Sequence, residues 1–585
     1  MSIPGETDVL VLGGGSAGCV LAARLSEDPA CRVLLVEAGR DISAVSMSPE
    51  IRSRYPGRAY LDTRNIWKEL TARMAAPAGN RDDRQPRRYE QARLLGGGSA
   101  INALMANRGQ PSDYDEWEEA GAQGWNWEAC LPFFRKLEAD QDFDGPLHGR
   151  DGPMRICRAR PDRISPFVAE VMKTLERTGT PRGVDQNGVW RDGVFVGALA
   201  VSDAGERLPT SVGYLTPAAR ARPNLFILTD HLAERILFEE RRAIGASVAP
   251  VAGGPAHVIR ARETVVASGA IHSPALLLRS GLGSAADLYK LGVPVIRSLS
   301  GVGRNLMEHP SIAVSAVLSP KGRTPDADEH HEQAIWRFSS LMADTPLGDM
   351  HGAILSRSSW HSVGWRIGTI FFWVNKSYSR GYLALASPDP RAEPAVDFRM
   401  LSDVRDLDRL KLATRRGAVV LSDPSLRPLC RHVFPSSYSP RVARVAAPGR
   451  WNALQRGILC ALLDRAGPLT GSLVHRVVTG GVTLTDLLAD DDALTTFVRR
   501  SVGGTWHPSG TCRMGHEDDC EAVTDARGKV HGIAGLRVCD ASIMPTIPCA
   551  NTNIPTIMVA ERIAAFMQEE SSQKGIDNGT KPLSE

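Results

Sequence analysis

The first forty positions alternate between apolar runs of strand length and one segment with helical spacing. Short runs rich in valine and leucine lie at 8–12 and 32–37. Between them, the apolar residues of 19–26 recur at the spacing of one helix face. Strand, helix and strand within about 30 residues is the size of a βαβ unit. The pattern therefore predicts an α/β unit at the start of the chain.

A glycine-rich turn joins the first strand to the helix. Gly13, Gly15 and Gly18 fit the pattern G-x-G-x-x-G. The first glycine permits a tight turn, the second lets a pyrophosphate approach the backbone, and the third lets the helix pack on the sheet. Glu37 follows at a strand end, where it can accept from a ribose hydroxyl. The turn predicts a dinucleotide site. By itself it does not separate FAD from NAD or NADP, although Glu37 argues against a 2′-phosphate.

Later apolar runs indicate further strands and helices. The stretch 208–310 contains short strand-like runs with little helical periodicity. Residues 369–386 hold two apolar runs around a polar turn, which predicts an antiparallel hairpin in a sheet that roofs the active site. The runs 401–412 and 490–500 predict helices over that sheet. The polar tail after Gln568 predicts disorder.

Composition and charge are those of a globular protein. The 585 residues are 43% hydrophobic and 23% charged, and the net charge of +3 is too small to imply a nucleic-acid partner. Ten cysteines show no metal-ligand spacing, which favours a reduced, cytoplasmic interior and no metal site. The first strand begins within ten residues of Met1, which leaves no room for a cleavable signal, and no apolar run reaches transmembrane length.

Positive charge is concentrated in the segment 427–476. It holds eight arginines, one acid and no lysine, together with apolar residues at roughly helical spacing between Trp451 and Leu463. The pattern predicts a basic helical elaboration. Three interpretations remain open: a solvated cap, a contact for self-association, and a patch for an anionic membrane surface that would make the protein peripheral.

A second glycine-rich loop, Ala92–Asn102, predicts another close approach to a ligand. The stretch 92–117, which contains this loop, resembles the first signature of the glucose–methanol–choline (GMC) oxidoreductases. Later segments resemble, in order, the family's second signature, its GVGxNLxDH run, its catalytic histidine motif and its C-terminal flavin-binding block. These segments are 268–283, 301–309, 506–515, and 537–542 with 551–556.

The resemblance implies a discontinuous FAD-binding domain with an inserted substrate domain. We expect an α/β fold in which a Rossmann-like FAD-binding domain carries an α+β substrate lobe, built on an antiparallel sheet covered by helices. The expected boundaries are 1–155, 208–310 and 496–570 for the FAD-binding domain, 156–207 and 311–495 for the substrate domain, and 571–585 for a disordered tail.

The resemblance also implies catalytic residues. Alcohol oxidation removes a proton from oxygen and a hydride from carbon, and a base with a pKa near the operating pH is best suited to take the proton. His507 matches the family's base. Its partner in the family is a second histidine or an asparagine, and Asn553 matches that position better than Asn551. His272 and His309 are expected to hold loops.

Further residues are expected around the cofactor and the substrate. Ile101 stands where some family members attach FAD through a histidine, so FAD is expected to be non-covalent. Pro555 would open a helix whose positive end stabilises negative charge on the flavin. Met105, Trp373 and Trp506 are expected to contact the substrate. The expected cofactor-binding residues are Gly13, Gly15, Ser16, Ala17, Glu37, Ala38, Arg93, Gly97, Ser99, Asn102, Ala233, Asp540, Ala541, Asn551 and Pro555.

The activity implied by the resemblance is FAD-dependent oxidation of a primary alcohol to an aldehyde. Within the family, the segments 93–99, 107–109, 372–376 and 550–555 are most similar to hydroxymethylfurfural and aryl-alcohol oxidases, which favours a furanic or aromatic substrate. The alternatives are a choline-type or aliphatic-alcohol dehydrogenase with a quinone acceptor, a hydroxynitrile lyase, and a flavin-binding protein without activity. The sequence leaves dioxygen and quinone open as acceptors.

Overall fold

A seven-stranded sheet carries the N-terminal βαβ unit in the computed structural model, which describes residues 3–579 apart from 78–81, 83, 327 and 437–443. β1 pairs in parallel with β2 and with β12, β2 pairs in parallel with β9, and β12 with the short β22. β10 and β11 extend the sheet as an antiparallel hairpin. Its strands are β1 (Glu6–Leu12), β2 (Val33–Val36), β9 (Leu225–Leu228), β10 (His231–Glu239), β11 (Arg242–Pro250), β12 (His257–Val266) and β22 (Leu536–Val538).

This sheet draws its strands from three distant parts of the chain. Its central strands are buried and apolar on both faces. All four residues of β2 are buried, and so are the last four of β1. Parallel strands covered on both faces read as such continuous apolar runs. The helix α1 (Ser16–Leu25) packs closely at Gly18, where a Cβ atom would lie 1.9 Å from the carbonyl oxygen of Gly13. The predicted α/β fold is confirmed.

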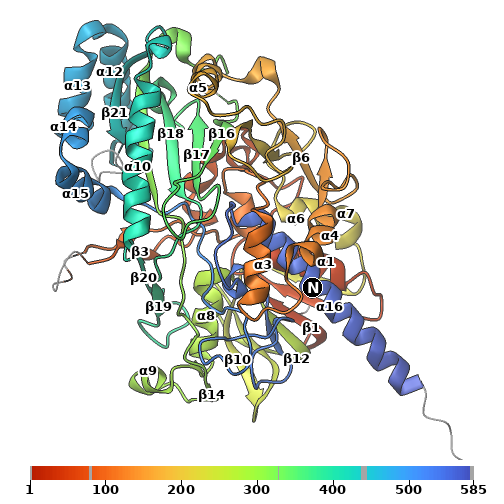
Figure 1. Ribbon diagram of the computed structural model, residues 1–585. Helices are drawn as coiled ribbons and strands as arrows, with labels where there is room; N and C mark the ends of the chain where they lie inside the picture. Colours follow the sequence, from red (N-terminus) through yellow and green to blue (C-terminus); the bar gives the residue numbers. More distant parts are fainter. Residues whose placement is uncertain (1–2, 78–81, 83, 327, 437–443, 580–585) are drawn as a thin grey trace, which may run out of the picture.

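A six-stranded antiparallel sheet forms the second large layer, in the order β21-β15-β18-β17-β16-β7. Figure 1 shows α10 and the helices α12 to α15 gathered beside this sheet, away from the sheet around β1 and β12. Its strands are β7 (Gly193–Val196), β15 (Ser311–Leu318), β16 (Glu332–Phe338), β17 (Met350–Leu355), β18 (Ile367–Val374) and β21 (Cys430–Ser436).

Smaller sheets and short helices connect the two layers. The four-stranded sheet β19-β20-β3-β4 and the three-stranded sheet β5-β6-β8 are separate from both. Their strands are β3 (Thr71–Ala75), β4 (Arg87–Arg88), β19 (Tyr382–Ala384), β20 (Ala395–Met400), β5 (Glu138–Asp140), β6 (Met154–Arg158) and β8 (Ala198–Ala200). The helices between them include α3 (Pro111–Glu119), α4 (Trp127–Leu137), α5 (Pro166–Arg177) and α8 (Gly269–Arg279).

The hairpin predicted for 369–386 is wrong. Its first run is β18, but its second run, β19, pairs with β20 in the four-stranded sheet. The connecting loop is held elsewhere by charge: the buried ammonium of Lys376 pairs with the carboxylate of Asp113. The carboxylate of Asp406 accepts from the backbone N–H groups of Tyr378 and Ser379. These contacts lead the chain from one sheet to the other.

The predicted helices over the six-stranded sheet are confirmed as α10 (Val404–Leu421) and α15 (Asp491–Ser501). The segment 427–476 is only partly helical, because its start forms β21 and pairs with β15. β21 is the edge strand of the six-stranded sheet. The rest includes α12 (Arg450–Arg465) and α13 (Thr470–Val477), and α14 (Leu484–Ala489) follows the segment.

The tail is not disordered where it is described. α16 (Asn553–Gly579) begins two residues before Pro555 and continues through the first part of the predicted tail. Glu570 fixes it to the body of the protein through Arg537, at 2.6 Å. A polar helix needs only its own backbone hydrogen bonds to extend beyond such a contact. Residues 580–585 lie outside the described part of the chain.

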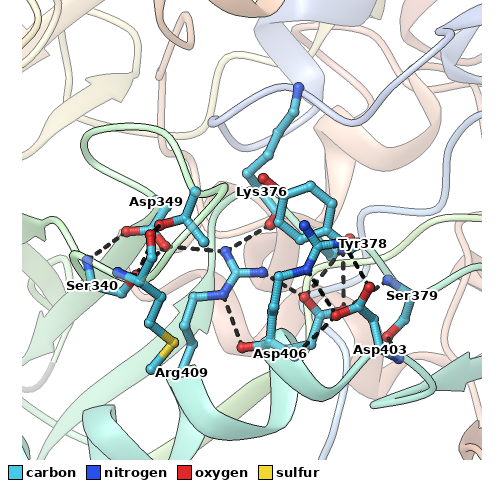
Figure 2. A network of polar contacts seen from close by, with 12 residues as sticks. Ser340, Asp349, Lys376, Tyr378, Ser379, Asp403, Asp406 and Arg409 are labelled. Carbon is cyan, nitrogen blue, oxygen red and sulfur yellow. Dashed lines mark hydrogen bonds and ion pairs between the residues drawn. The ribbon is translucent and has the colours of Figure 1, made fainter.

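A buried charge network fixes α10 to the loops beside it (Figure 2). The guanidinium of Arg409 is fully buried and pairs with Asp406 at 2.6 Å and with Asp349 at 3.2 Å. It also donates to the carbonyl oxygen of Lys376. Asp349 in turn accepts from the backbone and hydroxyl of Ser340. Because Asp349 directly precedes β17, the network anchors that end of the six-stranded sheet.

We expect replacement of Arg409 by methionine to destabilise the fold by about 3–5 kcal/mol, because two buried carboxylates lose their cation. Urea unfolding followed by circular dichroism measures the change. Arg415→Met is the matched control on the same helix, since its partner Asp491 is largely exposed, and little change is expected there. Equal stability of the two variants would contradict the role given to Arg409.

Candidate active site

A cavity of about 2260 Å³ lies between the two large sheets. Most of the predicted site residues line it. Those that do are Gly13, Gly15, Ser16, Ala17, Glu37, Ala38, Gly97, Asn102, Met105, Ala233, Trp373, Trp506, His507, Asp540, Ala541, Asn551 and Asn553. The glycine turn after β1, the second glycine loop and the residues before α16 therefore meet in one space.

Three predicted residues do not line the cavity but support its walls. Arg93 lies over the ring of Trp67 and donates to the carbonyl oxygen of Ala38. Ser99 is buried and donates to the carbonyl oxygen of Gly96. Pro555 is buried in the first turn of α16, where a missing N–H group leaves no helical bond unmade. A contact from these three residues to a cofactor stays a prediction.

The glycine loops fit a bound dinucleotide. A Cβ atom at Gly15 would meet no protein atom closer than 3.9 Å, and one at Gly98 would meet none within 4 Å. Both glycines line the cavity, so the open space beside them is not needed for packing of the chain itself. The N-terminus of α1 opens onto the same space without a side-chain cap. Free N–H groups at such a terminus suit a phosphate.

Two buried carboxylates shape the walls of this half of the cavity. Glu37 accepts from the backbone N–H groups of Gly14, at 2.8 Å, and Gly39, at 2.7 Å. Asp540 accepts from the backbone N–H of Gly269, at 2.8 Å, and from a serine hydroxyl. Burial raises the pKa of both carboxyls, while the hydrogen bonds favour the ionised forms. Each holds one turn of backbone against the cavity.

His507 is held by the buried carboxylate of Glu308. The backbone N–H of His507 donates to this carboxylate at 3.0 Å, and so does the hydroxyl of Thr505. The backbone N–H groups of His309 and Thr505 and the hydroxyl of Tyr89 also donate to it. Burial raises the pKa of Glu308. One side chain thus fixes the loop of His507 to the strand entry at 308–309.

Asn551, and not Asn553, lies beside His507. The amide nitrogen of Asn551 is 3.3 Å from Nε2 of His507, and its amide oxygen accepts from Asn107 at 2.6 Å. Asn553 begins α16 and accepts from the hydroxyl of Ser16, at 2.7 Å. The prediction that Asn553 partners His507 is therefore wrong. The match to the family motif had placed the partner two residues too far along the chain.

The neighbours of His507 determine which ring nitrogen carries its proton. Nε2 of His309 lies 3.2 Å from the carbonyl oxygen of Pro548, which can only accept, so Nδ1 of neutral His309 is a free acceptor. This Nδ1 is 2.9 Å from Nδ1 of His507. The hydroxyl of Thr505, whose proton goes to Glu308, is 2.7 Å from the same nitrogen. Both contacts require a proton on Nδ1 of His507.

The contact with Asn551 leads to the same tautomer from the other side of the ring. Because the amide oxygen of Asn551 accepts from Asn107, its NH₂ group faces Nε2 of His507 and donates. Nε2 is therefore an unprotonated acceptor at the cavity. Burial lowers the pKa of His507 to about 3, so the ring is neutral near pH 7. Nε2 can therefore accept a proton, but burial disfavours the resulting positive charge, so proton transfer depends on neighbours that stabilise it.

Aromatic side chains flank His507. The ring of Trp373 lies 6.4 Å from that of His507, centroid to centroid, and stacks on His351 at 3.9 Å. Trp506 is 45% exposed, lies at a φ of +60°, and donates to Glu90 from its indole nitrogen. Met105 is almost fully buried at the cavity wall. All three residues predicted to contact the substrate line the cavity.

Several residues of the site were not predicted from the sequence. Glu308 and Thr505 hold the base, and Asn107 orients Asn551. His309, expected to hold a loop, also contacts the base directly. Glu308 and His309 stand in the GVGRNLMEH run, so a signal for them was present. Nothing in the local pattern links that run to position 507. His272 pairs with Glu393 at 2.9 Å and lies outside the arrangement around His507.

Fold and site together are those of a dinucleotide-binding protein whose cavity holds a buried, neutral histidine. Two family models, both described as GMC oxidoreductase, match residues 7–311 and 377–560. The chain belongs to the GMC oxidoreductase family. The predicted family, enzyme class and FAD cofactor are confirmed.

The chain is similar to characterised relatives along almost its whole length. It is 42% identical to 5-(hydroxymethyl)furfural oxidase of Methylovorus sp. (strain MP688), over 95% of this chain and 98% of the relative. It is 30% identical to human mitochondrial choline dehydrogenase, over 96% and 90%. The solved structure of pyridoxine 4-oxidase from Mesorbium loti matches with a TM-score of 0.78 and 26% identity, over 96% and 99% of the two chains.

The two glycines of the first turn provide a matched test of cofactor binding. Gly15→Ala meets open space at an allowed backbone conformation. We expect the stability of the apoprotein to stay within about 0.5 kcal/mol and the FAD content to fall. Gly18→Ala clashes with Gly13 and should destabilise the apoprotein by about 1–3 kcal/mol. Thermal unfolding and the flavin absorbance of purified protein measure both. Full FAD content in Gly15→Ala would place the pyrophosphate elsewhere.

Proposed function

We propose that this protein oxidises a furanic or aromatic primary alcohol to the aldehyde, with dioxygen as the electron acceptor. The observation that carries the proposal is the neutral His507, whose unprotonated Nε2 faces the cavity beside Asn551. When bound, FAD supplies the acceptor for the substrate hydride. The aromatic side chains of Trp373 and Trp506 suit a flat substrate at this point.

The protein's part in the reaction is to hold and move one proton. The amide of Asn551 can donate to the substrate oxygen, while Nε2 of His507 takes the hydroxyl proton. The ring then carries a positive charge, and its Nδ1–H remains bonded to Thr505 and His309. The nearby carboxylate of Glu308 stabilises this charge. The geometry therefore favours deprotonation of the alcohol without movement of the base.

α16 adds an electrostatic contribution. Asn551, Thr552, Asn553 and Thr556 line the cavity at the start of this helix. The N-terminus of a helix carries a partial positive charge of about half an elementary charge. It therefore favours negative charge at this end of the cavity. Such charge develops only as the substrate hydride is transferred, so the helix favours the transfer itself.

The substrate class rests on the cavity wall and on similarity to the furfural oxidase. Two alternatives are a choline-type dehydrogenase with a quinone acceptor, favoured by the 30% identity to choline dehydrogenase, and a lyase that does not change the redox state of FAD. Benzyl-type alcohols added without dioxygen separate the three. Bleaching of the flavin excludes the lyase, and fast reoxidation by dioxygen excludes the dehydrogenase.

His507→Ala should reduce the rate of anaerobic flavin reduction by about 10²–10⁴-fold, because the base is lost. Asn551→Ala should reduce it by about tenfold, the effect of one hydrogen bond. Asn553→Ala, two residues away, loses its bond to Ser16 and not a contact with His507, so it should reduce the rate less than Asn551→Ala. Stopped-flow absorbance follows each reaction. A larger effect of Asn553→Ala than of Asn551→Ala would reinstate the assignment made from the sequence.

We further propose that α12 binds an anionic lipid surface. One face of α12 exposes Trp451, Leu454, Ile458 and Leu462, each 49–70% exposed. The flanking Arg450 and Arg465 are exposed as well. Apolar residues flanked by arginine suit an interfacial helix. Self-association through the same face is the alternative.

Fewer arginines of 427–476 are free than the sequence suggested. Arg456 is buried and donates to the carbonyl oxygens of Val445 and Ala447, and Arg431 donates to that of Leu463. Arg441 lies outside the described residues. Among the described residues, no helix is both long and apolar enough to cross a bilayer.

Co-sedimentation with vesicles tests the lipid proposal. We expect binding to vesicles of anionic but not of neutral lipid, and weaker binding as salt rises, because surface charges are screened. Leu454→Asp should reduce binding. Thr485→Asp, at an exposed position on α14, changes the net charge equally and controls for it. Failure to bind anionic vesicles at low salt, with a dimer in sedimentation velocity, would favour self-association.

A further inference from the structure

The cavity continues well beyond His507. Ligand pockets for compact small molecules are typically about 300–1000 Å³, and this cavity is about 2260 Å³. The part of the cavity lined by the glycine loops would hold FAD. The remaining part is lined by residues of β15, β17, β18, β21 and the helices α12 to α15, none of which carries His507. We call this remaining part the outer chamber.

The floor of the outer chamber is one face of the six-stranded sheet. Alternate residues of β18 line the cavity: Ile367, Thr369, Phe371 and Trp373. Alternate residues of a strand share a face and advance about 3.4 Å per residue. From Trp373, beside His507, to Ile367 the floor therefore extends for about 20 Å. A single furan or benzene ring at His507 would leave most of this length empty.

The hydroxyl groups on the floor have partners, whereas Glu332 on β16, which lines the cavity in register with Leu355, has one carboxylate oxygen without a partner among the described residues. The hydroxyl groups of Ser315 and Thr369 are 2.8 Å apart, and Ser315 also bonds to Ser436. All three residues line the cavity, so their hydroxyls are satisfied by one another across adjacent strands. Small residues at 313 and 353 keep the floor open beside Phe371.

The roof is apolar as well. Side chains from three helices face the floor, and β21 contributes one more. These residues are Leu459 on α12, Leu473 and Val477 on α13, Phe497 on α15 and Phe434 on β21. The charged residues Asp486 and Arg500 that line the cavity nearby are exposed. Ile458 and Leu462 line it and remain about half exposed. The chamber thus reaches the surface at α12.

We propose that the outer chamber binds an extended apolar group attached to the alcohol, such as an alkyl chain on a hydroxymethyl-substituted ring. This inference rests on the proposed oxidation of an aromatic alcohol at His507. The ring lies beside Trp373 and His507, and the chain follows the floor toward Ile367, under Leu459 and Leu473. Burial of apolar surface drives the binding.

The proposal is tested with a series of 4-alkoxybenzyl alcohols, from methoxy to octyloxy. Full burial of one methylene contributes a factor of about four in affinity, and partial burial about two. The efficiency of anaerobic flavin reduction should therefore rise by about 100-fold or more over the seven added methylenes. Because dioxygen and quinones are absent, a tail on an electron acceptor plays no part in this measurement.

Two leucine variants on α12 locate the effect. Leu459→Gln lies in the roof and should remove most of the gain with chain length, while benzyl alcohol should reduce the flavin within about twofold of the parent rate. Leu454→Gln, on the exposed face of the same helix and outside the cavity, should leave both unchanged. FAD content and thermal unfolding establish that the variants are folded.

The outcomes separate the two proposals. Equal efficiency for all chain lengths, with benzyl alcohol active, overturns the outer chamber and leaves the proposed function standing. A chain-length gain that persists in Leu459→Gln also overturns it. Absence of flavin reduction by any member of the series overturns the proposed function itself. A gain confined to reoxidation by long-tailed quinones assigns the chamber to the acceptor instead and overturns the inference.

Discussion

The buried carboxylate of Glu308 is the constraint on which the site depends. It accepts from the backbone of His309 and His507 and from the side chains of Tyr89 and Thr505. These donors come from three segments, each more than 190 residues from the next. A buried charge is tolerated only when it is fully hydrogen-bonded, so the four residues are held together by the same requirement. The hydrogen bonds to this carboxylate fix the position of the His507 loop, and the local sequence of the loop does not predict that position.

The rest of the fold forms the two walls of the cavity on either side of this loop, one from the parallel sheet and one from the antiparallel sheet. The parallel sheet ends in a glycine turn and an uncapped helix terminus, which together form a place for phosphate groups. The antiparallel sheet presents an apolar face with alternating side chains. The Arg409 network keeps the second sheet in place, since Asp349 directly precedes β17 and Lys376 follows β18. The cavity thus lies where the two layers face each other.

The sequence predicted those parts that rest on local patterns or on a recognised motif. The βαβ unit, its glycine turn, His507 and the helices α10 and α15 belong to this group. The failures have a common cause. The hairpin at 369–386 is locally plausible, but Lys376 and Asp406 bind partners elsewhere and divert the chain. Asn551 and Asn553 lie two residues apart at the start of α16, and the sequence motif does not decide which of them reaches His507. The contact of His309 with His507 spans 198 residues and has no local pattern.

The proton position on His507 is specified more than once. Thr505, His309 and the Asn107–Asn551 pair each require the same tautomer through a separate chain of hydrogen bonds. Because of this redundancy, the tautomer of His507 tolerates substitution of a single neighbour. Loss of one set of hydrogen bonds leaves two that still favour the proton on Nδ1. Loss of two sets at once removes most of the preference for this tautomer, so the effects of substitutions do not add. Evolution can therefore exchange these neighbours one at a time, and the order of the exchanges decides which sequences are reachable.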